Sequence, residues 1–186
     1  MRPTSNAFGW ENLYLFQITE EFLTLIRNLP GIPKVADLGV ALGYTTLCLL
    51  KETSAFVTAN DLDAGHLAEL YSQVPDGEKH RLSIIAGDAL GLNFQDSSLD
   101  GVLALRWMHF LRPAEIRRAF ANYAKWLNVG SLLCLTAATP FFAPAAAKFL
   151  AIYKERLRCN MEWPGEMDEK TMCFSPPGVV TDHGYL

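Results

Sequence analysis

The chain has 186 residues, and 50% of its side chains are hydrophobic, which is enough apolar material for one domain that folds without disulfides or metal ions. Its net charge of −4 and its 16 scattered Lys and Arg residues argue against nucleic acid as a partner, because binding to phosphates needs a clustered basic face. No apolar run reaches the roughly 18 consecutive residues that a membrane-spanning helix needs. We therefore expect one domain, with neither a membrane nor a nucleic-acid partner, that acts on small molecules.

The cysteines are spread along the chain without any C-x-x-C pair, at Cys48, Cys134, Cys159 and Cys173. Two of them fall in segments that we predict to be buried, which favours reduced core thiols over disulfides or zinc ligands. The N-terminus also lacks a basic region followed by an apolar block, the pattern of an export signal. These features predict a cytoplasmic protein without a bound metal.

A short apolar strand that carries an acid, Asp37, runs directly into a turn of small residues. Gly39, Ala41 and Gly43 allow the backbone of this turn to approach a ligand closely. The spacing does not fit a dinucleotide fingerprint, which has glycine where Tyr44 stands, nor a Walker phosphate loop, which closes with Gly-Lys-Ser/Thr. The pattern that remains is acid-x-Gly-x-small-x-Gly, and it indicates a different nucleotide-like ligand.

A second β-rich run, residues 55–61, also ends in an acid, Asp61, which follows Gly43 by 18 positions. This interval leaves room for one helix and a turn, so Asp61 is expected at the carboxyl end of a second strand. A carboxylate at that place can accept hydrogen bonds from both hydroxyls of a ribose. Asp63 is the competing candidate, but it is better explained as the cap of the helix that follows.

A third run, residues 82–88, closes with Asp88 and is followed by Ala89. An acid next to a backbone N–H donor can recognise the edge of an adenine ring. The alternative is an aspartate that only forms the turn, which is common after strands.

The rest of the chain continues the alternation of strands and helices. The run 101–111 predicts a fourth strand and a histidine-containing segment, Pro113 begins an amphipathic helix to about Leu127, and a fifth strand is predicted over 131–138. In this order the motifs of residues 18–140 resemble the class I methyltransferases that use S-adenosylmethionine.

The resemblance implies a cofactor and a set of residues that bind it. In that family the first loop packs on the methionine part of S-adenosylmethionine, the acid of the first strand orients its amino group, the second acid binds the ribose and the third binds the adenine. The implied cofactor-binding residues are Asp37, Gly39, Ala41, Gly43, Asp61, Leu62, Asp88, Ala89 and Arg106. The aromatic residues of the N-terminal segment either form a lid on the cofactor or cover an edge of the sheet.

The predicted fold is α/β, a doubly wound and mostly parallel sheet with helices on both faces. The strands are expected at 35–38, 55–60, 82–87, 101–105 and 131–138. The resembling Rossmann-like methyltransferase fold implies the strand order 3-2-1-4-5, with the cofactor across the carboxyl ends of the strands. Within this single domain we expect an N-terminal helical or lid segment over 1–30, a cofactor-binding core over 31–140, and a substrate-side tail over 141–186.

The tail departs from the family, in which an antiparallel hairpin follows the fifth strand. Residues 139–186 contain a predicted helix from Ala145 to Arg158 and a loop-rich stretch, but no pair of alternating apolar runs. We therefore expect the terminal hairpin to be missing or incomplete. The fifth strand would then be an exposed apolar edge, which predicts a homodimer that pairs through this strand.

The expected activity is transfer of a methyl group by in-line displacement to a small, partly apolar acceptor. Because the sulfonium is a good leaving group, a general base is optional, and His109 and Tyr44 are the weak candidates for that role. The alternative is a non-catalytic protein of the same fold that binds S-adenosylmethionine or S-adenosylhomocysteine, or that acts as an interaction module.

Overall fold

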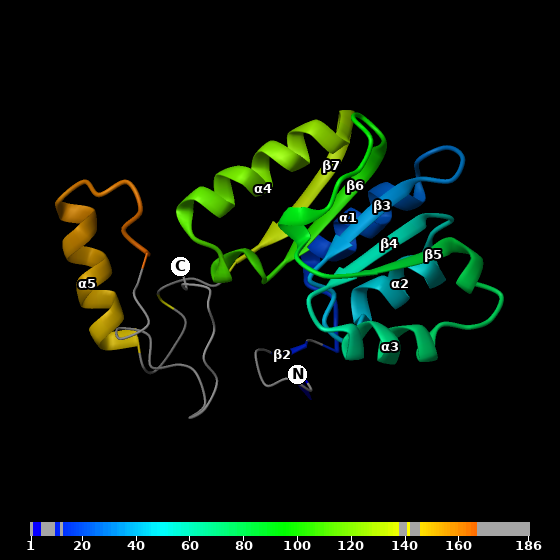
Figure 1. The fold of residues 1–186 in the computed structure, drawn as a ribbon, viewed down its shortest axis with the longest axis horizontal. Helices are drawn as coiled ribbons and strands as arrows, with labels where there is room; N and C mark the ends of the chain where they lie inside the picture. Colours follow the sequence, from blue (N-terminus) through cyan, green and yellow to red (C-terminus); the bar gives the residue numbers. More distant parts are fainter. Residues whose placement is uncertain (1, 5–9, 12, 138–140, 142–145, 167–186) are drawn as a thin grey trace.

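The structure is a computed structural model that describes residues 2–4, 10–11, 13–137, 141 and 146–166. Its main body is a sheet of five strands with helices on both faces (Figure 1). The strands of this sheet are β3 (Lys34–Leu38), β4 (Phe56–Asp61), β5 (Leu82–Ala86), β6 (Leu99–Leu105) and β7 (Leu127–Thr136). The helices are α1 (Gln17–Arg27), α2 (Tyr44–Glu52), α3 (Ala64–Gln73), α4 (Pro113–Trp126) and α5 (Ala146–Arg158), with short 3-10 turns η1 (Lys79–Arg81), η2 (Ala89–Gly91) and η3 (Met108–Phe110). A separate antiparallel pair joins β1 (Arg2–Pro3) to β2 (Trp10–Glu11).

The strands of the main sheet are all parallel and lie in the order β5-β4-β3-β6-β7. Counted along the chain this is 3-2-1-4-5, so the predicted α/β fold and strand order are confirmed. Parallel strands bring all their carboxyl ends to one edge, and the order reverses between β3 and β6. A ligand crevice is therefore expected at this edge, beside the end of β3.

Alternate residues of β3 face opposite helical layers, because successive side chains of a strand point to opposite sides. Val35 packs in a cluster with buried side chains of α1, α2 and α3, whereas Ala36 packs with those of α4. Gly101 in β6 lets α1 come close, since a Cβ there would lie 2.7 Å from Phe22 Cζ. The result is a three-layer arrangement in which Asp37, two residues after Val35, lies on the side of α1 to α3.

The last strand, β7, differs most from its prediction. The predicted fifth strand begins at residue 131, after Gly130, but β7 begins at Leu127, directly after α4. Its pairing with β6 shifts between Leu99, which faces Leu127, and Gly101, which faces Leu132. The extra residues form a bulge in which Gly130 has a φ of 87°. The prediction was wrong because a glycine in a bulge and a glycine in a turn look alike in sequence.

The other predicted elements agree with the structure to within one or two residues. For example, β6 begins at Leu99 rather than at residue 101, and β4 includes Asp61 itself. No strand follows β7 in the part of the chain that the structure describes. Most of the predicted tail lies outside the described residues, so the missing hairpin stays a prediction.

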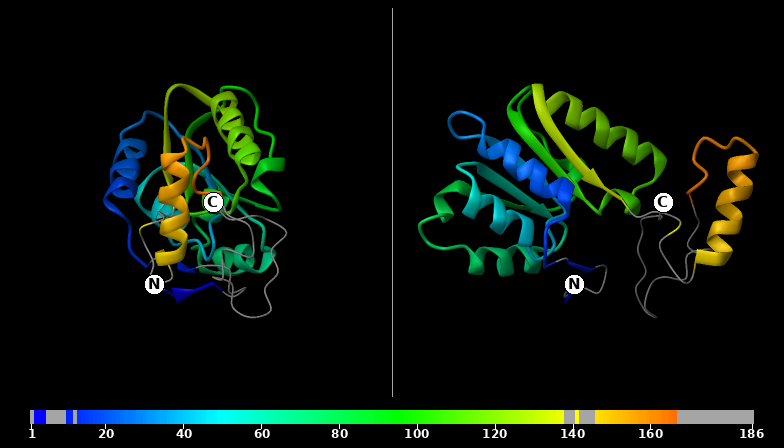
Figure 2. Two further views of the ribbon diagram at one scale, coloured as in Figure 1. Left: turned by 90° about the vertical axis from the view of Figure 1, so that its left-hand side faces the viewer. Right: turned by 180° about the vertical axis from the view of Figure 1, so that it is seen from behind.

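The tail helix α5 lies to one side of the sheet (Figure 2). The turn that follows it contacts α4, where Arg117 forms an ion pair with Glu162 and its guanidinium lies 5.3 Å from the centroid of the Trp163 ring. None of the helices among the described residues is both long enough and apolar enough to cross a membrane.

Candidate functional site

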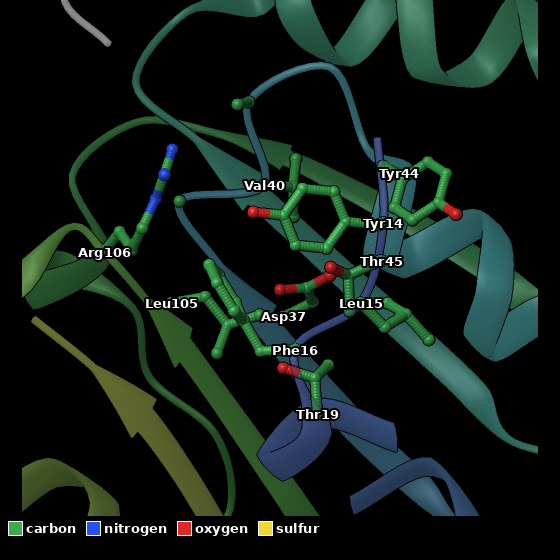
Figure 3. Close-up of a pocket in the computed structure, with 12 residues that line it drawn as sticks. Tyr14, Leu15, Phe16, Thr19, Asp37, Val40, Tyr44, Thr45, Leu105 and Arg106 are labelled. Carbon is green, nitrogen blue, oxygen red and sulfur yellow. The ribbon is translucent and has the colours of Figure 1, made fainter. Parts of the chain in front are cut away.

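A pocket opens at the carboxyl ends of β3 and β6, where the strand order reverses (Figure 3). The space between its lining atoms is about 540 Å³, a figure that includes the part open to solvent. Three segments far apart in the sequence form its walls: the N-terminal segment before and into α1, the loop from β3 to α2, and the end of β6. The lining residues are Tyr14, Leu15, Phe16, Thr19, Asp37, Gly39, Val40, Ala41, Tyr44, Thr45, Leu105 and Arg106.

The loop between β3 and α2 has a left-handed backbone at Gly39, Ala41 and Gly43, with φ values of 71°, 52° and 86°. Neighbouring side chains also require the glycines. A Cβ on Gly43 would lie 2.4 Å from Leu70 Cδ1, and a Cβ on Gly39 would lie 3.0 Å from Trp107. The sequence suggests that these glycines make room for a ligand; in the structure they also make room for α3 and for Trp107.

Asp37 is the buried acid of the pocket, with 2% of its surface exposed. Within the part of the chain that the structure describes, its carboxylate accepts one hydrogen bond, from Thr46 Oγ1 at 2.7 Å. Burial raises the pKa of Asp37 to about 6; the Thr46 hydrogen bond lowers it and the negative charge of Asp61 raises it further. A single hydroxyl donor does not compensate for the loss of water around this charge. A cation bound in the pocket would supply the missing compensation.

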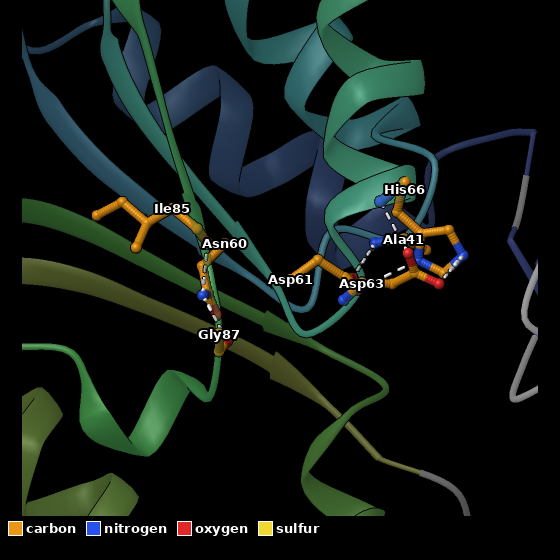
Figure 4. Close-up of polar contacts among 8 residues, drawn as sticks. Ala41, Asn60, Asp61, Asp63, His66, Ile85 and Gly87 are labelled. Carbon is orange, nitrogen blue, oxygen red and sulfur yellow. Dashed lines mark hydrogen bonds and ion pairs between the residues drawn. The ribbon is translucent and has the colours of Figure 1, made fainter.

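Asp61 stands at the end of the neighbouring strand β4 and is almost fully engaged by the protein (Figure 4). Its Oδ2 accepts the N–H of Ala41 at 2.8 Å, and its Oδ1 accepts the N–H of Asp63 at 2.9 Å. His66 Nδ1 lies 3.2 Å from the same Oδ1. Asp63 caps α3 by accepting the N–H of Gly65 at 2.8 Å, which confirms its predicted role as a helix cap. The ribose role of Asp61 stays a prediction.

The predicted adenine site lies on the exposed end of β5. Asp88 Oδ1 accepts the N–H of Leu90 at 2.9 Å and caps η2. Asp88 therefore forms the turn after β5, as the alternative prediction expected. Ala89 is buried next to it, whereas Leu62, after β4, is 67% exposed. An adenine role for these residues stays a prediction, because none of them lines the pocket in Figure 3.

Arg106 is the cation of the pocket lining. It follows β6 with a left-handed φ of 57°, an uncommon conformation for a residue with a side chain. Burial lowers the pKa of its guanidinium and the neighbouring Tyr14 phenol opposes that effect. The residue remains charged at neutral pH, because an arginine does not lose its proton in proteins.

The two candidate bases differ in position. Tyr44 lines the pocket, and its pKa is raised, chiefly by burial. His109 lies in η3, does not line the pocket, and has its pKa lowered to about 4 by burial and then by the charge of Arg106. At neutral pH the imidazole of His109 is therefore uncharged, and the phenol of Tyr44 keeps its proton. A catalytic role for either residue stays a prediction.

Sequence reasoning missed three polar residues of this region. Thr46 supports Asp37, and Asn60 donates from Nδ2 to the carbonyl oxygens of Ile85 and Gly87, each at 2.9 Å, which fixes the end of β5 (Figure 4). Thr19 is 1% exposed, and its Oγ1 has no hydrogen-bond partner among the described residues although it lines the pocket. The sequence signal that could have found these three residues is a polar side chain within a segment that is otherwise predicted to be buried.

The aromatic side chains Tyr14 and Phe16 lie at the pocket, beside Asp37 (Figure 3). The side chain of Trp10, another aromatic residue of this segment, is outside the described part. A lid role for the N-terminal segment stays a prediction.

Among the solved structures with the same fold are two N-methyltransferases and a cyclase. The phosphoethanolamine N-methyltransferase 1 of Haemonchus contortus, in complex with phosphoethanolamine and S-adenosylhomocysteine, is 21% identical over 68% of this chain and 28% of its own, with a TM-score of 0.55. The glycopeptide N-methyltransferase MtfA in complex with S-adenosyl-L-methionine is 24% identical over 69% of this chain and 55% of its own, with a TM-score of 0.55. The cyclase SpnF is 20% identical over 60% of this chain and 40% of its own, with a TM-score of 0.51.

These likenesses show the fold, and the chain spans between 28% and 55% of the length of the three structures. No curated protein matches the sequence at a significant level. The family model described as a methyltransferase domain matches residues 35–130, slightly more than half of the 186 residues. This range contains the glycine loop, Asp37, Asp61 and Asp88, and the chain belongs to this family of methyltransferase domains.

Proposed function

We propose that this chain binds S-adenosylmethionine at the carboxyl ends of β3, β4 and β5 and transfers its methyl group to a small acceptor by in-line displacement. The observation that carries the proposal is Asp37, a buried carboxylate that lines a pocket and has one hydroxyl donor among the described residues. The ammonium of the methionine part is a cation of the right kind to compensate this charge. Burying a carboxylate with so few donors lowers the free energy of unfolding of the free protein. A bound cationic ligand offsets this cost by pairing with the charge.

The remaining residues suit the other parts of the cofactor. Arg106 offers a guanidinium to the carboxylate of the methionine part, and the loop from Gly39 to Gly43 brings backbone groups close to it. Asp61 accepts from the ribose, and Asp88 with Ala89 recognises the adenine beside Leu62. These roles follow from membership of the family and from the position of each residue at one edge of the sheet.

When bound, S-adenosylmethionine supplies both the methyl group and a good leaving group. The protein has to hold the acceptor in line with that methyl group and exclude water, which accounts for a large part of the rate in such reactions. The pocket has an apolar side that suits a small, partly apolar acceptor, formed by Tyr14, Leu15, Phe16 and Leu105.

The cysteines favour a cytoplasmic location, because those in the described part of the chain, Cys48, Cys134 and Cys159, are free thiols.

Isothermal titration with S-adenosylmethionine tests the first half of the proposal, with S-adenosylhomocysteine as the product control. Release of S-adenosylhomocysteine in the presence of a panel of small amines, phenols and carboxylates tests the second half. Binding without release from any acceptor would reject methyl transfer, and absence of binding would reject the proposal entirely.

A second candidate is a protein that binds the cofactor but does not transfer its methyl group. One observation favours it: His109, a candidate base, does not line the pocket, and its lowered pKa of about 4 makes it a weak base. The cyclase SpnF also has this fold, which shows that the fold does not dictate the reaction. The two candidates predict the same titration with S-adenosylmethionine and differ in the release assay.

A further inference from the structure

His66 occupies an unusual position between two carboxylates at the start of α3. It is 3% exposed, and its Nδ1 lies 3.2 Å from Asp61 Oδ1. On the other side of the ring, Nε2 lies 3.7 Å from Asp63 Oδ2 and has no hydrogen-bond partner among the described residues (Figure 4). A buried histidine placed in this way is oriented by its contact with Asp61, because among the described residues that is the one hydrogen-bond contact of its ring.

The contact with Asp61 defines which ring nitrogen carries a proton. An ionised carboxylate accepts hydrogen bonds and has none to give, so Nδ1 must be the donor in this pair. His66 is thus a donor to Asp61 whether its ring is neutral or charged. The second nitrogen, Nε2, is beyond hydrogen-bond distance from Asp63.

The three donors to Asp61 are distributed unevenly over its two oxygens. Oδ1 accepts from the N–H of Asp63 and from His66, whereas Oδ2 accepts from the N–H of Ala41. A carboxylate has about four acceptor positions, two on each oxygen. With His66 in place, one position remains, on Oδ2, the oxygen that is tied to the glycine loop at the pocket. Asp61 therefore has room to accept one ribose hydroxyl rather than both.

The two backbone donors are the N–H of Ala41, in the glycine loop, and the N–H of Asp63, in the turn after β4. Each occupies one acceptor position on a different oxygen of Asp61 and leaves the second acceptor position of that oxygen open. His66 is the only side chain that donates to Asp61 in the described part of the chain. Removing its ring would leave one N–H on each oxygen and open the second acceptor position of Oδ1 to water or to a new partner.

We propose that His66 is a positioning residue that holds the Asp61 carboxylate so that Oδ2 faces the ribose of the bound cofactor. This inference rests on the proposed function, because it needs a ribose at Asp61. It goes beyond that function by assigning a role to a buried side chain that does not line the pocket.

Three substitutions of His66 separate positioning from simple packing. His66→Asn keeps an N–H donor at the place of Nδ1, so its amide can still reach Asp61. His66→Gln moves the donor outward to the place of Nε2, toward Asp63, and His66→Leu keeps the bulk of the side chain but has no donor. Circular dichroism and thermal unfolding establish which variants fold, and the Asn and Gln pair serves as the comparison if the Leu variant does not.

The measurement is the ratio of two dissociation constants, for S-adenosylhomocysteine and for its 2′,3′-dideoxyribose analogue. In the parent protein we expect the analogue to bind about tenfold more weakly or worse, the loss typical of a hydrogen bond to a charged group. His66→Leu and His66→Gln should reduce this ratio at least threefold, and His66→Asn should restore it to within about twofold of the parent.

A parent ratio well above one that stays unchanged in His66→Gln and His66→Leu would overturn the positioning role and leave the proposed function intact. A ratio that falls equally in all three variants would also overturn it, because packing would then explain the effect. A parent protein that does not bind S-adenosylhomocysteine would reject the proposed function, and this inference with it.

Discussion

Asp37 and Asp61 are the same residue type near the ends of adjacent strands, yet the protein treats them in opposite ways. Asp61 receives two backbone N–H groups and an imidazole, so its charge is largely satisfied before any ligand arrives. Asp37 receives one hydroxyl, and burial raises its pKa to about 6. The difference indicates that Asp61 is a fixed acceptor, whereas Asp37 depends on a cationic ligand for its compensation.

The largest effect is expected from Asp37→Asn. Losing one partner of a buried charge pair costs about 2–5 kcal/mol of binding free energy, so the affinity for S-adenosylmethionine should fall by more than tenfold when measured by titration calorimetry. The free protein should nevertheless unfold at a higher temperature at pH 8, because the substitution removes a buried charge.

Asp96→Asn is the matched control for this substitution. Asp96 is an exposed acid whose Oδ1 lies 3.3 Å from Lys125 Nζ, away from the pocket. It should change neither affinity nor stability measurably. Equal affinities for the parent and Asp37→Asn would remove Asp37 from the cofactor site.

Asp61→Ala should weaken binding of S-adenosylmethionine by about 1.5–3 kcal/mol, the range for hydrogen bonds to a charged group. In contrast to Asp37→Asn, it should also lower the free energy of unfolding, since the N–H groups of Ala41 and Asp63 lose their acceptor. Chemical denaturation measures that loss separately, and we expect the domain to remain folded. A dissociation constant equal to that of the parent would take Asp61 out of the ribose role.

Asp88→Ala extends the comparison to the third strand and should have a smaller effect, about 1 kcal/mol of binding free energy. One adenine contact is lost, whereas the backbone N–H of Ala89 remains. The check is a pair of cofactor analogues with and without the adenine amino group. If the parent and the variant discriminate between them equally, the adenine assignment is wrong.

Leu133→Lys should have no effect on cofactor affinity. It tests whether two chains associate through the edge strand β7. We propose that two chains pair through β7, an edge strand among the described residues in which Leu133 is 37% exposed. Light scattering after size exclusion should show a dimer for the parent and a monomer for the variant. Ile84→Lys, on the opposite edge strand β5, is the control and should leave the dimer intact; a monomeric parent would contradict pairing through β7.

The strands and the position of the glycine loop could be predicted because their signals are local, whereas the strand order was implied by the resemblance to the methyltransferase fold. An apolar run, an acid and three small residues within a few positions specify a strand, a turn and a helix, and repeated alternation then requires a parallel sheet. The cap at Asp63 follows from the same local chemistry. The bulge in β7 could not be predicted, because it depends on its pairing with β6.

The supporting contacts of the site were also beyond sequence reasoning. Thr46 reaches Asp37 from the next helix, Asn60 bridges to the end of β5, and His66 turns back onto Asp61. Each contact joins segments whose separation in space is set only by the folded sheet. The acids themselves could be identified from the sequence. Which hydrogen-bond donors stabilise the negative charge of each acid depends on the tertiary structure.

The central claim, that Asp37 binds the ammonium of S-adenosylmethionine, is tested most directly by the protons released on binding. Its pKa of about 6 in the free protein means that about half of the molecules carry a proton on Asp37 at pH 6, and binding a cation should lower that pKa and expel the proton. Affinity should therefore rise with pH from 5 to 7, by up to about tenfold. Titration calorimetry at pH 6 in buffers of different ionisation enthalpy should show release of about half a proton in the parent and almost none in Asp37→Asn. Tight binding without proton release in the parent would contradict the claim.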